Sequence, residues 1–319
     1  MESLVELIPQ LFIDGLTLGL IYAIVAVGYT MVYGILEFIN FANSEIFMFG
    51  AFAGTEALLF MKGAGYLEQF SPGVALMIAL LFAVVLTGTL GFFIERIAYK
   101  PIRNSPKLVA FISAIGVSFV LQDLVRLVEG LWKNAFYITT PELFTETITI
   151  SSHMVIPYKV IIIAIISVAT MALLTLFINK TKWGKAMRAV AQDQDTASLM
   201  GINIDRTIAL TFVIGASLGG VAGTLFAVQY SLIHPYIGFI LGIKAFTAAV
   251  FGGIGNVPGA MLGGIILGLM ESFGSAFLGT LTFGVLGSEY KDVFAFSILI
   301  ILLIFRPGGL LGKNVREKV

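Results

Sequence analysis

The chain of 319 residues consists of long apolar runs separated by short polar clusters, and this pattern limits its fold more than any other feature. A hydrocarbon layer about 30 Å thick needs roughly 20 mostly apolar residues per helix. Charged residues make up only 12% of the chain and hydrophobic ones 58%, so a soluble fold would lack polar groups for its surface. The runs that meet or approach the required length are 16–35, 44–61, 73–94, 108–127, 158–178, 207–230, 238–251, 259–277 and 293–305.

We therefore expect an all-α polytopic membrane protein with about eight to ten transmembrane or re-entrant helices. The run 238–251 is short and contains Lys244, and the run 293–305 is short as well, so either could be re-entrant or tilted. The apolar stretch 4–13 could form an additional short helix on or in the membrane.

Basic residues predict the orientation. The segments 95–107, 179–206 and 306–318 hold 13 of the 19 Lys and Arg residues, and the positive-inside rule places them on the cytoplasmic side together with the C-terminus. The polar segment 129–157 should face outward, and the alternation over 145–150 suggests a short strand or hairpin. The side of the N-terminus stays open, and no removable signal peptide is expected.

Several classes of chemistry are disfavoured by composition. Cysteine is absent and the two histidines, His153 and His234, are too few for most zinc or haem sites, so we expect no metal. A net charge of zero disfavours nucleic acid as a partner. No phosphate-binding Gly-x-x-x-x-Gly-Lys-Ser/Thr loop occurs, so the chain should not hydrolyse ATP by itself.

Catalysis has one sequence motif in its favour. Residues 215–219 fit the Gly-x-Ser-x-Gly pattern of hydrolases, with Ser217 as the nucleophile and His234 as the nearest histidine that follows. That motif functions at a sharp strand-to-helix turn, whereas here it lies inside an apolar helix. We therefore expect no catalytic residue. The same region favours helix packing, because small residues four apart let two backbones approach closely in lipid. The candidate packing residues are Gly215, Gly219, Gly223, Gly259 and Gly263.

Charged side chains inside apolar runs are costly and mark candidates for function. They are Glu45, Glu56, Asp123, Lys244 and Glu271. Lys244 needs a carboxylate, a ring of carbonyls or water, and Glu271 is the nearest acid on the following helix. Each charge could belong to a structural ion pair or take part in passage or gating. Asn40, Asn43 and Ser44, beside Glu45, are expected to cap a helix and could also face a pore.

The segment 182–206 predicts two exposed helices. Residues 184–194 are compatible with a helix that carries Lys185 and Arg188, and a second short helix should begin with Asp195 or Thr196 as N-cap and end at Gly201. An exposed helix pair on a membrane protein is typical of a docking site for a cytoplasmic partner, although an ordinary solvated loop would give the same pattern.

Stretches along nearly the whole chain resemble the membrane subunits of ABC importers for branched-chain amino acids, the LivH type. The stretches that carry the resemblance are 40–42 with Glu45 and 48–51, 95–101, 183–189, 199–203, 244–246, 251–260 and 306–310. In addition, Asp195-Thr196-Ala197-x-x-x-Gly201 resembles the Glu-Ala-Ala-x-x-x-Gly loop by which importer membrane subunits dock on their ATPases.

The resemblance implies an ABC-importer permease fold in the bacterial plasma (inner) membrane, with 1–319 as one transmembrane domain, an outer segment at 129–157 and an ATPase-coupling segment at 180–206. It implies a second similar permease or a second copy, two cytoplasmic ATPases that bind ATP and Mg, and an external binding protein. The chain itself would need no cofactor. The implied coupling residues are Arg188, Asp195, Thr196, Ala197 and Gly201, and the candidates for pathway or gating are Asn40, Asn43, Glu45, Lys244 and Glu271.

The expected function is therefore import of branched-chain or other hydrophobic amino acids. Three alternatives remain: a permease for urea or short-chain amides, an ion-coupled secondary transporter that relays charge through Lys244, Asp123 and Glu271, and an intramembrane hydrolase that uses Ser217.

Overall fold

The computed structural model describes residues 2–36, 40–103, 105–151, 154–282, 285 and 287–312. Within them, seven helices are long and apolar enough to cross a membrane. They are α1 (Glu2–Leu36), α2 (Ala42–Gly63), α4 (Pro72–Ile94), α5 (Lys107–Lys133), α6 (Tyr158–Lys180), α9 (Ile204–Tyr230) and α11 (Val257–Leu281). Two shorter helices, α10 (Ile237–Gly252) and α12 (Lys291–Phe305), match the two runs that the sequence marks as short. The all-helical membrane class is confirmed.

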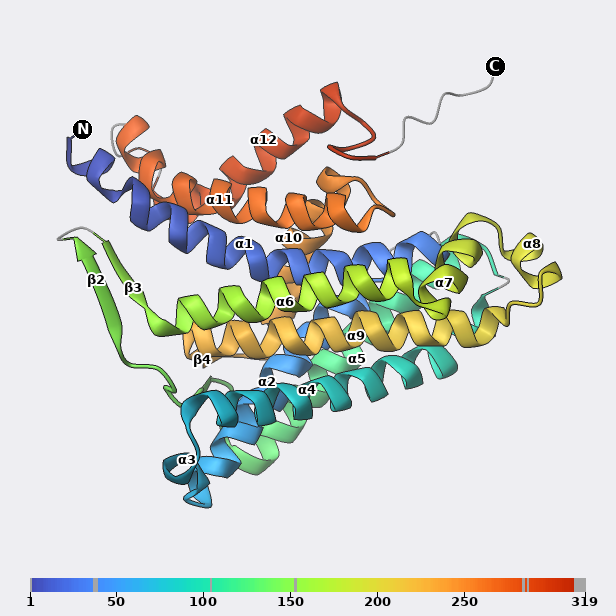
Figure 1. Ribbon diagram of the computed structural model, residues 1–319, viewed down its shortest axis with the longest axis horizontal. Helices are drawn as coiled ribbons and strands as arrows, with labels where there is room; N and C mark the ends of the chain where they lie inside the picture. The colour runs from blue at the N-terminus through green and yellow to red at the C-terminus, as the bar shows by residue number, and fades with distance from the viewer. Residues whose placement is uncertain are drawn as a thin grey trace.

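The remaining elements lie at the two ends of the bundle (Figure 1). At one end, which we call the α8 end, are α7 (Lys182–Gln192) and α8 (Gln194–Leu199). At the other, which we call the hairpin end, are α3 (Tyr66–Gln69), β2 (Thr147–Ser151) and β3 (Met154–Pro157). A π-helical turn over Glu95–Tyr99 and a 3-10 turn over Lys100–Ile102 follow α4, and another 3-10 turn, Ser288–Tyr290, precedes α12.

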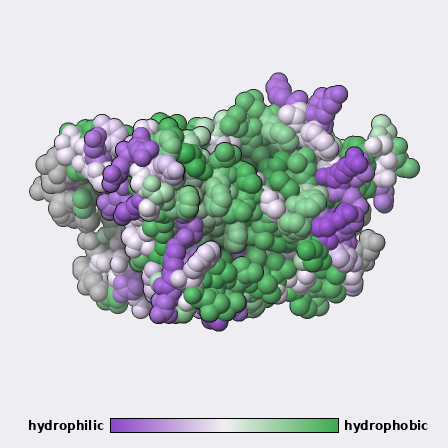
Figure 2. Space-filling model, turned by 90° about the horizontal axis from the view of Figure 1, so that it is seen from below, coloured by the Kyte–Doolittle hydropathy of each residue, from purple (hydrophilic) through white to green (hydrophobic). Residues whose placement is uncertain are grey.

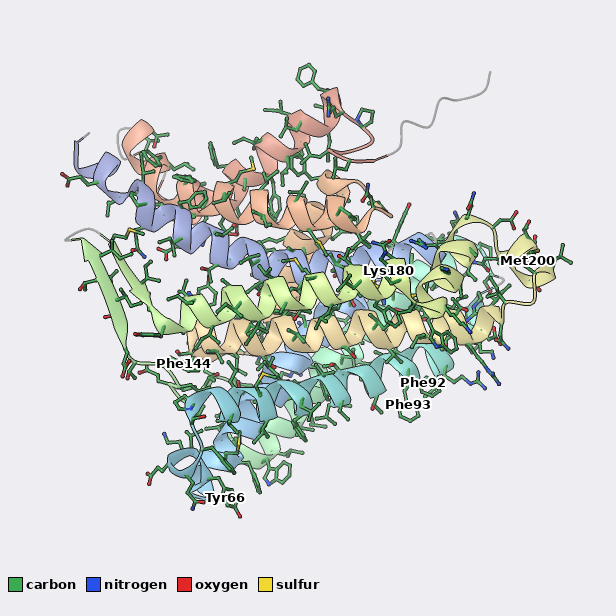
Figure 3. All side chains as sticks on the ribbon, in the orientation of Figure 1. Tyr66, Phe92, Phe93, Phe144, Lys180 and Met200 are labelled. Carbon is green, nitrogen blue, oxygen red and sulfur yellow. The ribbon has the colours of Figure 1, made fainter. Side chains whose placement is uncertain are left out.

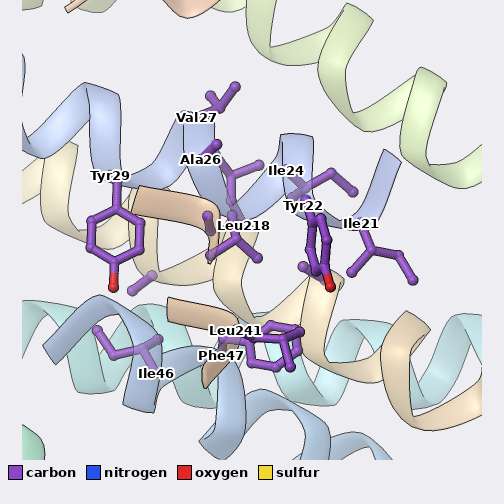
Figure 4. Packing of buried hydrophobic residues seen from close by; sticks show 14 of the residues in the cluster. Ile21, Tyr22, Ile24, Ala26, Val27, Tyr29, Ile46, Phe47, Leu218 and Leu241 are labelled. Atoms are coloured by element: carbon purple, nitrogen blue, oxygen red, sulfur yellow. The ribbon is translucent and has the colours of Figure 1, made fainter. Parts of the chain in front are cut away.

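The interior of the bundle consists of α1, α2 and α9. In its most apolar stretch α2 is 72% buried, whereas α5 and α6 are only 22% buried and form the periphery. Tyr22 and Tyr29 point away from α1 among buried side chains of α2, α9 and α10, including Phe47 and Leu241 (Figure 4). The visible surface is apolar over its middle and polar toward both ends (Figure 2). This distribution fits a molecule surrounded by lipid at its waist.

Helix α1 runs the full length of the bundle as one 35-residue helix. The expectation of a separate short helix over 4–13 is therefore wrong. Asp14 and Gly15 interrupt the apolar pattern without interrupting the helix, because Asp14 is exposed and accepts a hydrogen bond from Gln10 one turn earlier at 3.1 Å. Gln10 also accepts a hydrogen bond from the backbone of Val155 in β3 at 3.0 Å, so α1 begins at the hairpin end.

The predicted hairpin is confirmed, since β2 and β3 pair antiparallel. A second small pairing joins β1 (Ile138–Thr139) to β4 (Leu232–Ile233), just after α9. The hydroxyls of Thr140 and Thr55 share a hydrogen bond of 2.9 Å, which ties the segment after β1 to the second half of α2.

The five candidate packing glycines lie where helix backbones meet. A Cβ atom at Gly223 of α9 would be 2.2 Å from the carbonyl oxygen of Phe47 in α2, so that contact needs a glycine. Gly219 faces the same helix and Gly215 faces Gly28 of α1. In α11, Gly259 and Gly263 face the carbonyl oxygens of Gly252 and Ala248 in α10 at 2.3 and 2.1 Å from the same hypothetical atom. These approaches hold the short helix α10 against its neighbours.

Candidate functional site

The short helix α8 begins at a residue different from the predicted one. Its N-cap is Asp193, whose two carboxylate oxygens accept hydrogen bonds from the backbone N–H of Thr196 at 3.0 Å and from its hydroxyl at 2.9 Å. Asp195 and Thr196 therefore lie inside the first turn, and the expectation that one of them is the cap is wrong. The helix before it likewise covers Lys182–Gln192 instead of 184–194. The bonds from Thr196 lower the pKa of Asp193, so this cap is ionised at neutral pH.

The end of α8 is closed by its own backbone. Gly201 has a positive φ of 80°, its N–H donates to the carbonyl of Ser198 at 2.9 Å, and the N–H of Ile202 donates to that of Ala197 at 3.1 Å. This pair of bonds is a Schellman motif, in which glycine occupies the left-handed position at no steric cost. Gly201 is thus the helix stop that the sequence predicts.

Helix α8 presents an apolar tip. Leu199 and Met200 are 88% and 80% exposed, and Met200 lies at the extreme of the α8 end (Figure 3). Ala197 is buried, whereas Asp195 and Thr196 are exposed. Arg188 of α7 is exposed too, and it donates to Asn179 of α6 at 2.8 Å. The five predicted coupling residues therefore lie in one compact projection with solvent-facing side chains around a single buried alanine.

A side chain that the sequence did not single out connects this projection to the bundle. The amide nitrogen of Gln194, the first residue of α8, donates to the carbonyl oxygen of Ile35 at 2.9 Å. Ile35 lies in the last turn of α1, where carbonyl groups have no partner within the helix. A displacement of α8 would therefore reach the end of α1 directly.

An ion network fixes the neighbouring turn. Asp205, at the start of α9, accepts from Lys100 and Arg103, both at 2.6 Å, and Arg103 also pairs with the buried Glu95 at 2.6 Å. Tyr99 from the same turn donates to the amide oxygen of Asn40 at 2.5 Å. The α8 end is thus linked to the residues that precede α2.

Lys244 and Glu271 lie together inside the bundle, at 2.9 Å between Nζ and Oε1. Lys244 also reaches Asp292 of α12 at 2.7 Å, and Lys291 reaches Glu271 at 2.9 Å. The hydroxyl of Tyr22 in α1 donates to the second oxygen of Glu271 at 2.8 Å. The sequence pointed to Lys244 and its nearest acid and missed the other three members, which come from helices distant along the chain.

The first turn of α2 contains the other pathway candidates. The amide oxygen of Asn40 accepts from the backbone N–H of Ala42 at 3.1 Å, so Asn40 bonds the first turn of α2 from the position before the N-cap. Asn43 and Ser44 are not N-caps: the hydroxyl of Ser44 donates to the carbonyl of Phe41 at 2.6 Å, and the amide nitrogen of Asn43 is buried without a hydrogen bond in the described chain. The N-cap position belongs to Phe41, which has no side-chain bond to offer.

Glu45 is almost completely enclosed, with 1% of its surface exposed. Its Oε1 accepts a hydrogen bond from Ser118 of α5 at 3.2 Å, and its Oε2 has no hydrogen-bond partner among the described residues. Glu56 and Asp123, by contrast, are partly exposed near the hairpin end and are paired with Lys133 and Arg126.

The positions of Ser217 and His234 do not support the hydrolase alternative. Ser217 lies in the middle of α9, faces Gly88 of α4 and is 3.5 Å from the carbonyl oxygen of Val84. His234 lies beyond the end of that helix, beside the rings of Tyr137 and Tyr236. His153 lies outside the described residues. Within the described ranges no group of three or more His, Cys, Asp or Glu could hold a metal ion.

Two of the stretches that carry the family resemblance pack against each other. The turn between α10 and α11 contains Gly253 and Gly255, both with positive φ, and the segment after α12 lies on it. Leu310 N–H donates to the carbonyl of Phe251 at 2.8 Å, and the side chain of Asn256 donates to the carbonyl of Leu311 at 2.7 Å. This arrangement points to a structural role for both stretches.

Seven membrane-length helices among the described residues, a capped helical projection at one end and paired charges in the interior define a polytopic membrane protein. The chain belongs to the family of permease components of branched-chain amino acid transport systems, whose pattern matches residues 11–303. The family resemblance found in the sequence is confirmed, and the chain is a transport subunit and not an enzyme.

Relatives match over the full length. The high-affinity branched-chain amino acid transport system permease protein BraD of Pseudomonas aeruginosa is 45% identical over 312 residues, which cover 97% of each chain. The corresponding permease protein LivH of Escherichia coli K12 is 44% identical over an alignment that covers 100% of this chain and 99% of the relative. A probable branched-chain amino acid permease of Methanocaldococcus jannaschii is 26% identical over 92% of this chain and 89% of its own length.

Proposed function

We propose that the chain is the membrane-spanning subunit of an ATP-driven importer and that it carries branched-chain amino acids inward. The observation that carries the proposal is the identity of 44–45% over the whole length to two permease proteins named for high-affinity branched-chain amino acid transport. A sequence difference of this size from two full-length relatives is compatible with similar partner proteins and with a related substrate.

The docking partners are two cytoplasmic ATPases, which hold ATP and Mg, and each membrane subunit offers one α8 projection to them. The exposed apolar tip at Leu199 and Met200 suits a cleft on such a partner, because burial of two large side chains provides affinity at little polar cost. A second similar permease, or a second copy of this chain, would complete the membrane part. The outer segment 129–157 would receive an external binding protein.

The proposed orientation has the α8 end and the C-terminus in the cytoplasm. In Figure 1, α12 ends on the same side as α7 and α8, while α1 begins on the opposite side. The basic residues support this direction, because Lys100, Arg103 and Arg188 lie at the α8 end. The basic tail residues Lys313, Arg316 and Lys318 lie outside the described residues.

The pathway candidates divide into two groups by their pairing. Lys244 and Glu271 form a neutral cluster with Lys291 and Asp292, which supports an anchoring role and gives an ion relay no free charge to use. Asn40, Asn43 and Glu45 each have one buried polar atom without a hydrogen bond among the described residues, which supports a role in passage. The alternative of an ion-coupled secondary transporter is therefore the weaker one.

The test is purification of the tagged chain from its native membrane in mild detergent, followed by mass spectrometry and uptake in liposomes. Recovery of ATPases and a second permease, with ATP-dependent uptake of L-leucine in the presence of the binding protein, is the expected result. Uptake of urea or acetamide instead would support the amide alternative. Recovery of the chain alone, with uptake driven by an ion gradient, would overturn the proposal.

A further inference from the structure

One buried carboxylate of the described residues differs from the other buried charges. The buried Asp, Glu, Lys or Arg side chains of the described residues are Glu45, Glu95, Glu129, Lys244 and Glu271. The last four each have an oppositely charged group within 4 Å, from Arg103, Lys133 or each other. Glu45 has no cation at that distance in the described part of the chain, and an unpaired carboxylate in a membrane protein interior is costly. The contrast indicates that no described residue serves as the cationic partner of Glu45.

The carboxylate of Glu45 lies at mid-depth. Ser118, which donates to it, is near the centre of the 27-residue helix α5. On the other side, α10 approaches so closely that a Cβ atom at Gly238 would lie 2.6 Å from Oε2. Three helices, α2, α5 and α10, therefore surround the group, and any solute that crosses the bundle here must pass it.

Four further polar atoms, on α1 and around the start of α2, are buried without a hydrogen bond in the described chain. They are the hydroxyls of Tyr29 and Thr30 on α1 and the amide nitrogens of Asn40 and Asn43 around the start of α2. A Cβ atom at Gly242, one turn after Gly238, would lie 3.0 Å from the Tyr29 hydroxyl oxygen and 2.1 Å from the Cβ of Ser44. The Tyr29 hydroxyl is thus beside the residue that precedes Glu45. All four atoms can donate a hydrogen bond, whereas the Glu45 oxygen can only accept one when it is ionised.

An apolar wall adjoins these donors. A small internal space of about 10 Å³, enough for roughly one water molecule, is lined by Tyr29, Thr30, Asn40, Phe246, Ala249 and Ile254, among others. The ring of Phe41 lies 6.3 Å from that of Phe246, between centroids, and Tyr29 lies 6.1 Å from the same ring. This wall therefore combines aromatic and aliphatic surface with a few polar atoms, and in this conformation it is closed to a solute the size of an amino acid.

We propose that these groups form a substrate site for a zwitterionic α-amino acid with an apolar side chain. The carboxylate of Glu45 receives the ammonium group, and the hydroxyl of Tyr29, on the same α10-facing side, donates to the substrate carboxylate. The apolar side chain lies against Phe246 and its neighbours. The inference rests on the proposed function and deepens it, because it names the groups that recognise each part of the substrate inside the membrane.

Occupancy would supply a partner to Glu45 and to Tyr29. The ammonium group neutralises a carboxylate that is otherwise unpaired among the described residues, and the substrate carboxylate accepts from a hydroxyl that is otherwise unsatisfied there. A 2-oxo acid of the same shape would leave Glu45 unpaired, and sites built to bind a polar group reject analogues that lack it. The site therefore discriminates by charge, while the apolar wall sets side-chain size only loosely.

The test compares Glu45→Gln with the parent in the complete complex reconstituted in liposomes. We expect uptake of L-leucine to fall by roughly thirtyfold or more, as for loss of one partner of a buried charge pair. ATP hydrolysis stimulated by the loaded binding protein should persist. The matched control is Glu68→Gln on the exposed α3, which should change neither quantity. Normal uptake by Glu45→Gln would overturn the inference and leave the proposed function standing, whereas absence of ATP-dependent uptake in the parent would overturn the proposed function first.

A second measurement avoids dependence on assembly and turnover. In detergent without binding protein, millimolar L-leucine should raise the melting temperature of the parent complex, and 4-methyl-2-oxopentanoate should not. Glu45→Gln should lose the shift. If that variant fails to assemble, Tyr29→Phe removes a single hydroxyl and should diminish the leucine shift without lowering the unliganded melting temperature. An undiminished shift in Tyr29→Phe, or an equal shift with the 2-oxo acid, would contradict the proposal.

Discussion

At the scale of single residues, ion pairing distinguishes the buried charges that stabilise the bundle from Glu45, which has no oppositely charged neighbour among the described residues. Lys244 is surrounded by two carboxylates and the ring of Tyr22, whose centroid is 5.9 Å from Nζ. The sequence could predict that Lys244 needs a partner because a lysine in a short apolar run has nowhere to extend. The sequence could not predict Asp292 as a partner of Lys244, because no sequence pattern indicates that α12 packs against α10.

Lys244→Met is expected to reduce stability in detergent by about 1–2 kcal/mol, the scale of paired polar groups in membrane proteins. The substitution leaves Asp292 without its cation, while Glu271 keeps Lys291. Thermal unfolding followed by fluorescence measures the effect. Restoration of stability by a second change, Asp292→Asn, would support the pairing. Lost transport with unchanged melting would instead place Lys244 in the pathway.

At the scale of elements, helix positions follow from the length of apolar runs, and the details of caps do not. All nine apolar runs correspond to helices, because a helix is the conformation that satisfies every backbone group within its own segment in lipid. The expected cap of α8 lies two or three residues after the observed one, because Asp193, Asp195 and Thr196 are all good N-caps, and only the fold shows which one has the extended backbone that a cap needs. The sequence did not single out Tyr29 and Thr30, although both are polar residues inside the apolar run 16–35.

Gly201→Asp is expected to leave the protein in the membrane and to uncouple it from ATP hydrolysis. A residue other than glycine at φ 80° is strained by about 1–2 kcal/mol, which loosens the turn that closes α8. Membrane content by immunoblot and uptake with ATPase activity measure the two effects. Gly116→Ala is the control, because that glycine of α5 has open space around it. Normal transport by Gly201→Asp would contradict the assignment of α8 as the docking element.

Gln194→Ala is expected to weaken the link between α8 and α1 without preventing docking. The loss of the bond to Ile35 should reduce uptake per ATP hydrolysed, while co-purification with the ATPase stays unchanged. Gln192→Ala is the matched control, since Gln192 is exposed at the end of α7. An unchanged ratio of uptake to hydrolysis in Gln194→Ala would show that displacement reaches the bundle by another contact.

At the scale of the whole molecule, the alternation of helices gives an odd number of passes between the hairpin end and the α8 end. The bond from Val155 to Gln10 and the bond from Gln194 to Ile35 fix the two ends of α1, so the chain begins opposite the docking projection. Sequence alone left the N-terminal side open, because the first 61 residues contain neither Lys nor Arg and the positive-inside rule had nothing to count there.

Single cysteines test this orientation directly, since the chain has none of its own. In spheroplasts, a membrane-impermeant maleimide should label Thr145→Cys, in the outer segment, before lysis. Ser198→Cys on α8 should react only after lysis. Both positions are exposed, so access and not burial decides the outcome. The parent chain serves as the blank, and labelling in the opposite order would invert the proposed topology.

Because α10 is short, a change in bilayer thickness should affect the helices of this molecule to different extents. With 16 residues α10 is about 24 Å long, less than the roughly 30 Å of a hydrocarbon layer. It is held between α11, α1 and α2, whereas α5 and α6 at the periphery are of full length. Hydrophobic mismatch therefore acts on the outer helices before it acts on α10, so lipids of different chain length should change the assembly of the complex sooner than its choice of solute.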